Sequence, residues 1–430
     1  MIQTIIQPGR AEWEALCQRP KIQGLNLDEL TQQVFKEIER DGDRAIYKYT
    51  ALFDGIVPQS LKLTPAEIAE CAAKTPEELQ QAIQVAKANI EKFHGLQKET
   101  ISYVETTPGV VCWRESRAIE KVGIYIPGGS APLFSTVLML AIPARIAGCK
   151  QIVLCTPPGQ DGKINDAILY AAQITGVTEV YAVGGIQAIG AMAIGTESVP
   201  KVDKIFGPGN QYVTAAKQMA VRYGTTIDLP AGPSEVLVIA DDTVNPEYIA
   251  ADLLSQAEHG PDSQVLLLST DKAVAEDTLV ALNRQVDRLP RKDIALKTLK
   301  NSKVIVLNTI EECIAFSNMY APEHLIIAGD TAENYIDRVV NAGSVFLGNY
   351  SCESAGDYAS GTNHTLPTNG YAKSCSGVSL DSFIKKITFQ KITPAGLQNI
   401  GPAIAVMAKA EQLDAHSNAV TIRLKDLKNV

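Results

Sequence analysis

The chain has 430 residues, of which 46% are hydrophobic and 20% are charged. These proportions are typical of a globular protein that buries large cores, and the length favours roughly two to four domains. The formal net charge is −9, and the lysines and arginines are spread along the sequence. We therefore expect neither a nucleic acid nor a membrane as a partner, because both bind concentrated positive charge.

We expect no targeting or membrane-spanning segment. The first twenty residues include two arginines and two glutamates, which is unlike a secretory signal. Residues 122–144 carry no charge and are long enough to cross a bilayer, but Pro127-Gly128-Gly129-Ser130 interrupts them. A strand, a glycine turn and a buried helix explain this stretch better. The eight cysteines form no Cys-x-x-Cys motif, which favours reduced thiols and a cytoplasmic location.

Residues 26–100 show the hydrophobic periodicity of helices. Two helix starts stand out at Thr64-Pro65 and Thr75-Pro76, where a threonine cap precedes a proline and an acidic first turn. From about residue 120, short β-rich runs alternate with helical segments, which predicts parallel sheets covered by helices. The expected strands lie at residues 123–126, 152–155, 180–183 and 204–206, then at 236–239, 265–268, 304–307, 325–328 and 345–347.

These two series of strands predict an α/β fold with two incomplete Rossmann-like, parallel-sheet domains, a helical N-terminal region and a helical C-terminal tail. Residues 393–430 have the pattern of one or two amphipathic helices. A segment this short cannot bury its apolar face alone, so it must pack on the body of the protein or on a second subunit.

Four of the five histidines lie beyond residue 255, each near a carboxylate or an amide. Histidine is the commonest metal ligand and titrates near neutral pH, so this placement suggests a metal site with a proton-transfer base. An equally good explanation of this placement is that the four histidines are unrelated residues of the surface or the core. The four occur in Gln256-Ala257-Glu258-His259, in Glu323-His324, in Asp357-(six residues)-His364 and in Glu411-(four residues)-His416.

Two of these motifs have a definite expected geometry. Gln256 and His259 are three residues apart at the end of a helix, so they share a face and could bind one ion, although structural roles remain open. Glu323 and His324 begin a predicted strand and could act as acid and base. Neighbours on a strand point to opposite faces, so both serve one cleft only if the backbone turns there, and a surface ion pair is an equal alternative.

Residues 354–364 are rich in glycine and small polar residues, and we expect a loop that presents Asp357 and His364. For a nucleotide, the sequence lacks both Gly-x-Gly-x-x-Gly and a Walker motif. Glycine turns at residues 184–187 and 207–210 lie between predicted strands and helices, where helix N-termini could face a pyrophosphate. Purely structural turns are the alternative, since such turns serve every βα unit.

Several longer motifs resemble the signature of the histidinol dehydrogenase family. The resemblance covers nearly the whole chain, most clearly from about Gly123 onward. The motifs are Ile-Asp-Leu-Pro-Ala-Gly-Pro-Ser-Glu-Val-Leu at 227–237, Asp-Leu-Leu-Ser-Gln-Ala-Glu-His at 252–259, Pro-Glu-His-Leu at 322–325 and Gly-Asp-Tyr-Ala-Ser-Gly-Thr-Asn-His-Thr-Leu-Pro at 356–367.

The resemblance implies an enzyme that oxidises L-histidinol through L-histidinal to L-histidine with two NAD⁺, the last steps of histidine biosynthesis. It also implies an intertwined homodimer with one zinc ion per subunit. By this resemblance, zinc is bound by Gln256, His259, Asp357 and His416, which also border the substrate. The catalytic residues are Glu323 and His324, and the substrate is also contacted by Ser234, His364 and Glu411. The residues expected to contact NAD are Tyr125, Gln187 and Asn210.

With these roles, we expect four parts along the chain. Residues 1–25 form an N-terminal arm, and residues 26–120 with 232–375 form a first α/β domain that carries the metal and catalytic residues. Residues 121–231 form a second Rossmann-like domain that binds NAD. Residues 376–430 form a helical tail that contributes to the partner subunit's site.

Other functions compete with this interpretation. The nearest is a relative with the same zinc and NAD chemistry that oxidises another small polar alcohol, such as a sulfonated diol. A zinc hydrolase could use Glu323 as its base, but it would leave the α/β half at residues 120–210 without a role. A non-catalytic binding protein explains neither Glu323-His324 nor the spacing of the ligands.

Overall fold

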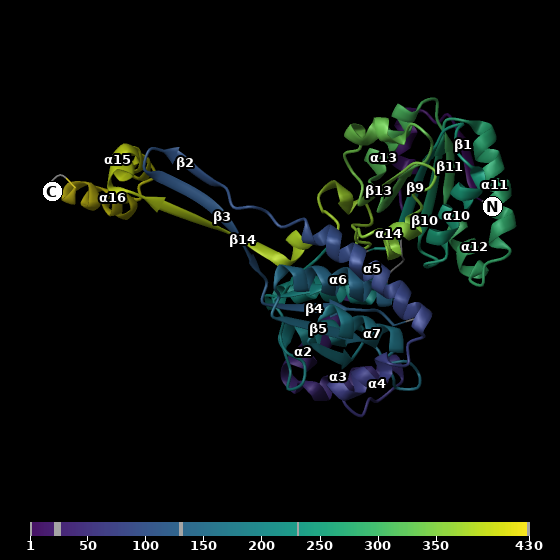
Figure 1. Cartoon of the computed structure of the whole chain (residues 1–430), viewed down its shortest axis with the longest axis horizontal. Helices are drawn as coiled ribbons and strands as arrows, with labels where there is room; N and C mark the ends of the chain where they lie inside the picture. The colour runs from purple at the N-terminus through teal and green to yellow at the C-terminus, as the bar shows by residue number, and fades with distance from the viewer. Residues whose placement is uncertain (1, 21–26, 129–131, 230–231, 428–430) are drawn as a thin grey trace. The chain divides into compact units, whose positions relative to one another are not determined.

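The computed structural model describes residues 2–20, 27–128, 132–229 and 232–427. It divides into two units, each described by itself: residues 1–97 with 119–383, and residues 98–118 with 384–430 (Figure 1). Gly129 and Ser130 of the expected glycine turn lie outside the described residues, as do residues 21–25 of the expected N-terminal arm.

The first unit contains a parallel sheet with helices on both faces. Alternate residues of its central strand point to opposite faces: Val236 and Val238 pack with α10, α11 and α12, whereas Leu237 and Ile239 pack with α13 and Trp13. In spatial order the strands are β1 (Gln3–Ile6), β11 (Lys303–Val306), β10 (Gln264–Ser269), β9 (Glu235–Ala240), β12 (His324–Ile327) and β13 (Ser344–Leu347). The helices are α1 (Trp13–Leu16), α10 (Pro246–Ala257), α11 (Lys272–Val286), α12 (Lys292–Lys300), α13 (Ile310–Tyr320) and α14 (Glu353–Tyr358).

The first unit also contains a second parallel sheet covered on both faces. Helices α5, α6 and α7 pack on one face, and α2, α3, α8 and α9 pack on the other, while α4 packs on α7. In spatial order the strands are β6 (Glu179–Ala182), β5 (Gln151–Thr156), β4 (Lys121–Tyr125), β7 (Lys204–Phe206) and β8 (Thr226–Ile227). The helices are α2 (Leu27–Asp41), α3 (Asp43–Asp54), α4 (Pro65–Ala72), α5 (Glu77–Gly95), α6 (Phe134–Ala147), α7 (Asp166–Thr175), α8 (Gly185–Ile194) and α9 (Gln211–Ala220).

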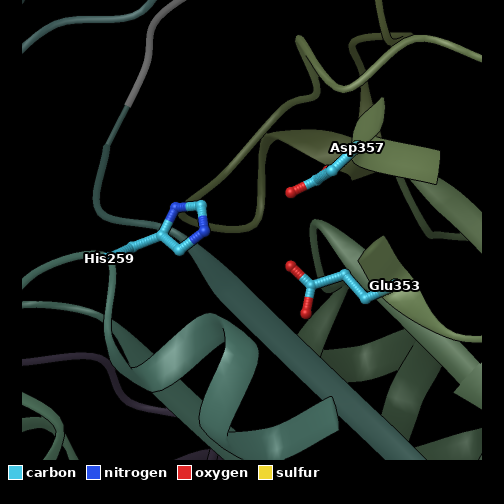
Figure 2. Close-up of side chains that lie close together, drawn as sticks. All are labelled: His259, Glu353 and Asp357. Atoms are coloured by element: carbon cyan, nitrogen blue, oxygen red, sulfur yellow. The ribbon is translucent and has the colours of Figure 1, made fainter. Parts of the chain in front are cut away.

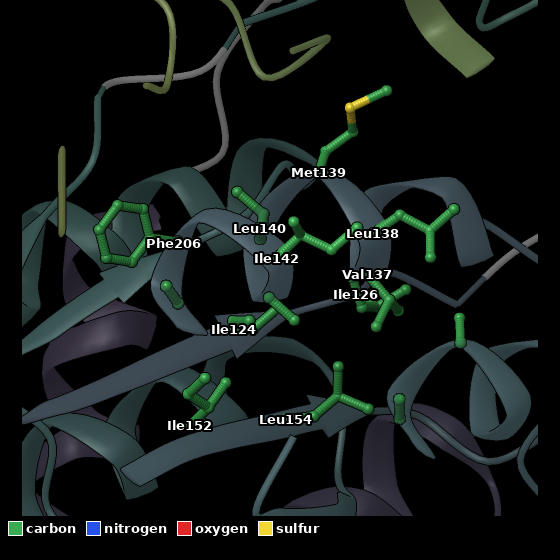
Figure 3. Close-up of a cluster of buried hydrophobic side chains, with 14 of the residues drawn as sticks. Ile124, Ile126, Val137, Leu138, Met139, Leu140, Ile142, Ile152, Leu154 and Phe206 are labelled. Carbon is green, nitrogen blue, oxygen red and sulfur yellow. The ribbon is translucent and has the colours of Figure 1, made fainter. Parts of the chain in front are cut away.

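Burial explains the uncharged stretch at residues 122–144. Figure 3 shows Ile124 of β4 and Leu138 and Ile142 of α6 meeting in one cluster with Leu154 of β5. Residues 135–144 of α6 are all buried, so the helix needs no polar face. Across the described ranges, no helix is both long and apolar enough to cross a membrane.

The second unit contains the antiparallel strands β2 (Tyr103–Thr107), β3 (Val110–Ala118) and β14 (Ile384–Ile392). They are followed by α15 (Pro394–Ala410) and α16 (Asp414–Asp426), which pack on each other. The helices confirm the helical end of the chain that the sequence predicts. The strands correct the expectation that residues 376–430 are purely helical, because β14 pairs along its whole length with β3, more than 260 residues earlier.

The expected parallel strands and the α/β fold class are confirmed, and all nine strands lie within two residues of the expected bounds. One grouping differs. We expected residues 26–120 to share a domain with 232–375, but α2, α3 and α5 bury their apolar faces on the sheet of β4 to β8. Residues 103–118 instead form β2 and β3 of the second unit. Strand β1 also joins the expected N-terminal arm to the first sheet.

Candidate functional site

Three potential metal ligands lie together in the first unit: His259, Glu353 and Asp357 (Figure 2). One ligand atom from each lies within 4.8 Å of the other two. His259 lies two residues beyond the end of α10. Glu353 and Asp357 are four residues apart on α14, so these two carboxylates share a helix face. We expected a loop over residues 354–364, but its first part is wrong, because residues 354–358 belong to the helix α14.

Asp357 has a property that fits a cation. Its Oδ1 atom is buried and makes no hydrogen bond within the described part of the chain, although it lies 3.5 Å from Nε2 of His324. A buried carboxylate oxygen without a partner is costly, and a bound cation removes that cost. Nitrogen and carboxylate donors together suit Zn²⁺.

Gln256 is fully buried on the last turn of α10, beside this cluster. With its amide oriented to satisfy its neighbours, its nitrogen donates to the Glu353 carboxylate. Ser255 Oγ donates to the same carboxylate at 2.8 Å. The amide oxygen of Gln256 then points away from the Glu353 carboxylate. This oxygen is the atom of the amide that can bind a metal ion.

Sequence reasoning missed Glu353. Its signal is the four-residue spacing to Asp357, which places both on one helix face. That signal is readable only if the segment is assigned to a helix.

The Glu323–His324 pair lies at the start of β12 and is buried. Glu323 precedes β12, which begins at His324, and Ala321, two residues before Glu323, has a φ of +55°. Glu323 Oε2 and His324 Nδ1 are 3.6 Å apart. The main chain of Glu235 contacts both: its N–H donates to Glu323 Oε2 at 2.8 Å, and its carbonyl oxygen lies 3.2 Å from His324 Nδ1.

The pKa values of this cluster reflect burial beside charged neighbours. Burial alone would lower the pKa of His324, but the carboxylates of Glu323 and Asp357 raise it well above its usual value. Burial raises the pKa of Glu353 to about 8. Burial opposes ionisation of Asp357, yet the His324 imidazole holds the pKa of that carboxyl below its usual range. Desolvation lowers the pKa of His259, although part of the residue is exposed, and this favours the neutral imidazole, the form that can bind a metal ion.

A cavity of about 160 Å³ connects these groups with the loops of the second sheet, including Gly207, Pro208 and Leu229. His364 is fixed at its wall, with Nδ1 2.9 Å from the Asp357 carbonyl oxygen and Nε2 3.0 Å from Thr136 Oγ1. A larger groove of about 710 Å³ elsewhere in this unit contains none of the expected residues. The expected residues that line the smaller cavity are Ser234, Gln256, His259, Glu323, His324, Asp357 and His364.

The three expected NAD residues lie at or beyond the carboxyl ends of strands in the second sheet. Tyr125 ends β4, and its hydroxyl accepts the Gly185 N–H at 3.1 Å. Gln187 is buried in the first turn of α8 and donates to Asp54 Oδ2 at 3.0 Å, while its Oε1 has no hydrogen-bond partner in the described part of the chain. Asn210 caps α9, which follows β7. Strand order reverses at β4, since β5 and β7 flank it, and such switch points form nucleotide crevices.

Glu411 and His416 belong to the second unit. Glu411 ends α15 and His416 lies in the first turn of α16, and both are exposed in this chain. Both lie outside the unit that contains the cavity, so the roles of Glu411 in substrate binding and of His416 in zinc binding are still predictions from the resemblance.

Comparisons with known proteins agree with the resemblance. The histidinol dehydrogenase family model matches residues 17–424. Histidinol dehydrogenases of Bacteroides fragilis and Salmonella typhimurium are 56% and 52% identical to the chain, covering 98% and 96% of it and 98% and 95% of their own lengths. The crystal structure of histidinol dehydrogenase from Elizabethkingia anophelis is 61% identical, with a TM-score of 0.98 over 99% of both chains. The chain therefore belongs to the histidinol dehydrogenase family of oxidoreductases.

Proposed function

We propose that the protein oxidises L-histidinol through L-histidinal to L-histidine, with two NAD⁺ and one zinc ion per subunit, as the last steps of histidine biosynthesis in the cytoplasm. The observation that carries this proposal is the convergence of the Glu323–His324 pair in one cavity with the buried Asp357 Oδ1, which makes no hydrogen bond to the described residues. Oxidation of an alcohol and then an aldehyde requires a base, a water-activating group and an anchor for the substrate.

The metal is held, in this proposal, by Gln256, His259 and Asp357 with His416. Zinc, when bound, anchors the substrate nitrogens and orients the carbinol carbon towards the nicotinamide. Glu353 keeps the Gln256 amide turned so that its oxygen is available, because the amide nitrogen donates to the Glu353 carboxylate.

His324 is the base for the first step. Its Nδ1 lies 3.2 Å from the Glu235 carbonyl oxygen, so Nδ1 carries the hydrogen and Nε2 is the basic nitrogen. As hydride leaves the carbinol carbon for NAD⁺, Nε2 accepts the hydroxyl proton and the aldehyde forms. The neighbouring carboxylates, which raise the pKa of His324, stabilise the imidazolium.

Glu323 acts in the second step. His324 first releases the proton of the first step to solvent. The Glu323 carboxylate then takes a proton from water as the water oxygen bonds to the aldehyde carbon, which gives the monoanion of the hydrate. Hydride passes from this monoanion to the second NAD⁺, while His324 takes the remaining hydroxyl proton. The carboxylate product remains, and the protons on Glu323 and His324 reach solvent. Ser234, His364 and Glu411 would bind the polar ends of the substrate.

The cofactor would lie at the crevice where the second sheet reverses its strand order. Tyr125, Gln187 and Asn210 surround the carboxyl ends of the strands there. The buried Oε1 of Gln187, which accepts no hydrogen bond from the residues that the structure describes, supports a ligand contact at this residue.

We propose a homodimer in which His416 and Glu411 complete the partner subunit's site. The support is the surface of α15 and α16, where Val406, Met407 and Ile422 are at least half exposed. Such apolar side chains favour an interface with another chain. Mixing inactive His416→Asn protein with inactive His259→Asn protein should then restore activity in mixed dimers. If verified mixed dimers stay inactive, each site is built within one chain.

The direct test of the proposed substrate is product analysis. Zinc-loaded protein is incubated with L-histidinol and NAD⁺, and the amino acids are separated and identified by mass spectrometry. L-Histidine is the expected product. Oxidation of a sulfonated diol, without turnover of L-histidinol by the same folded protein, would assign the chain to a related dehydrogenase of different specificity.

A further inference from the structure

Arg19, near the end of the N-terminal segment, makes an ion pair deep in the first unit. Its guanidinium donates through Nε and Nη2 to both carboxylate oxygens of Glu235, the second at 2.8 Å. The Glu235 side chain is only 3% exposed, and that of Arg19 is 16% exposed. The guanidinium also lies 3.9 Å from the centre of the Tyr320 ring and donates to the Tyr320 carbonyl oxygen at 2.9 Å. A forked arginine held this way fixes orientation as well as charge.

The partner of this arginine is the residue whose main chain contacts both members of the Glu323–His324 pair. The Glu235 N–H donates to Glu323 Oε2, and the Glu235 carbonyl oxygen accepts from His324 Nδ1. The Glu235 carboxylate also accepts the Asn369 N–H at 3.0 Å. Its side chain is thus tied on two sides, which fixes the peptide groups that hold the pair.

Arg19 has a second link to the same pair. Its Nη2 donates to the carbonyl oxygen of Ala321 at 3.3 Å. Ala321 has a φ of +55° and lies two residues before Glu323, at the start of the segment that leads into the pair. Such a conformation is unfavourable for alanine and persists only where surrounding contacts hold it. Arg19 therefore contacts both the turn before the pair and the residue that hydrogen-bonds to the pair.

We propose that Arg19 and Glu235 are positioning residues that hold Glu323 and His324 in their reactive geometry, so that the N-terminal segment is part of the support of the active site. This inference rests on the proposed function. Neither side chain lines the cavity, so its loss changes the alignment of the pair rather than the binding of substrate or cofactor. A misalignment of about 1 Å costs on the order of 100-fold in rate.

The test compares Arg19→Lys and Arg19→Ala with Arg10→Ala, an exposed arginine of the same segment. For both Arg19 variants, kcat with L-histidinol and with L-histidinal should fall about 10- to 100-fold. The KM values for the substrates and NAD⁺ should change less than about twofold, and the zinc content should stay at the wild-type level. Added guanidinium should restore part of the activity of Arg19→Ala but not of Arg19→Lys, whose ammonium occupies the site. Arg10→Ala should behave as wild type.

Glu235→Gln provides a second perturbation that keeps the side-chain shape. The Arg19→Lys/Glu235→Gln double variant should lose no more activity than the worse single variant, because both act through one contact. Wild-type kcat in folded Arg19→Ala, purely additive losses in the double variant, or equal losses in Arg10→Ala would overturn the inference. Absence of NADH formation by wild-type protein with L-histidinol would instead contradict the proposed function.

Discussion

The ion pair between Lys217 and Asp228 gives a quantitative test of how the wall of the cavity formed by the second sheet is held together. Both side chains are at most 2% exposed, and Nζ lies 2.5 Å from Oδ1. Lys217 also donates to the Gly207 carbonyl oxygen at 2.8 Å, and Asp228 accepts the N–H groups of Gly207 and Leu229 at 2.8 and 2.7 Å. The pair therefore joins the two loops that line the cavity from the second sheet.

Lys217→Met keeps the length of the side chain but leaves a buried carboxylate without its cation. Breaking a buried pair in this way costs about 3–5 kcal/mol. Unfolding entropy of about 2.1 cal/mol/K per residue gives about 0.9 kcal/mol/K for 430 residues, so the thermal midpoint should fall by about 3–6 °C. Lys217→Met/Asp228→Asn removes both charges and should recover at least half of this loss.

Thermal unfolding of the zinc-loaded protein, followed by circular dichroism, measures these shifts. Lys150→Met is the matched control, because its pair with Glu120 is exposed, at 77% and 59%. It should shift the midpoint by less than about 1 °C. Equal shifts for Lys217→Met and Lys150→Met, or a double variant no more stable than Lys217→Met, would refute the reasoning.

Three further variants change Glu353, Glu323 and Asp252, the last of which lies on α10. Glu353→Gln should lower zinc affinity about 10- to 100-fold in a chelator competition while the fold is kept, because it weakens the contact that orients Gln256; unchanged affinity would remove Glu353 from that role. Glu323→Gln should slow oxidation of L-histidinal far more than the first oxidation of L-histidinol to L-histidinal in single-turnover experiments, since only the second step needs water, and equal losses would exclude water activation. Burial raises the pKa of Asp252 to about 6, above its unfolded value, so the stability it contributes is full below about pH 4 and is lost as the pH rises through 6. Between pH 4 and 7, Asp252→Asn should reduce the fall in the free energy of unfolding by up to about 3 kcal/mol, as measured by urea titration. The same fall in Asp252→Asn as in the wild-type protein would contradict the raised pKa of Asp252.

The sequence predicts the parallel sheets well because their strands are short, buried and bounded by glycine and proline turns. Residues 204–206, for example, are expected as a strand and form β7 with the same bounds. It predicts the second unit poorly. The nine residues of β14 are mostly exposed and alternate irregularly, and their pairing with β3 depends on a segment far away in the sequence. No local pattern reveals such a pair.

Some residues of the site can likewise be predicted from the sequence, and others cannot. His259, Glu323 and His324 stand out because histidine and glutamate in short motifs are chemically distinctive. Arg19 and Glu235 do not stand out, since one lies 216 residues from the other and only the folded sheet joins them. Supporting contacts of this kind depend on tertiary structure, whereas reactive groups depend on residue type.

The proposed reaction is a metal-dependent oxidation of L-histidinol that removes four electrons. It is tested by counting the NADH molecules formed per L-histidinol consumed, on zinc-loaded protein and on protein stripped with a chelator. We expect about two NADH per substrate, loss of activity on stripping and recovery with added zinc. One NADH per substrate, or undiminished activity in protein shown by metal analysis to lack zinc, would contradict it.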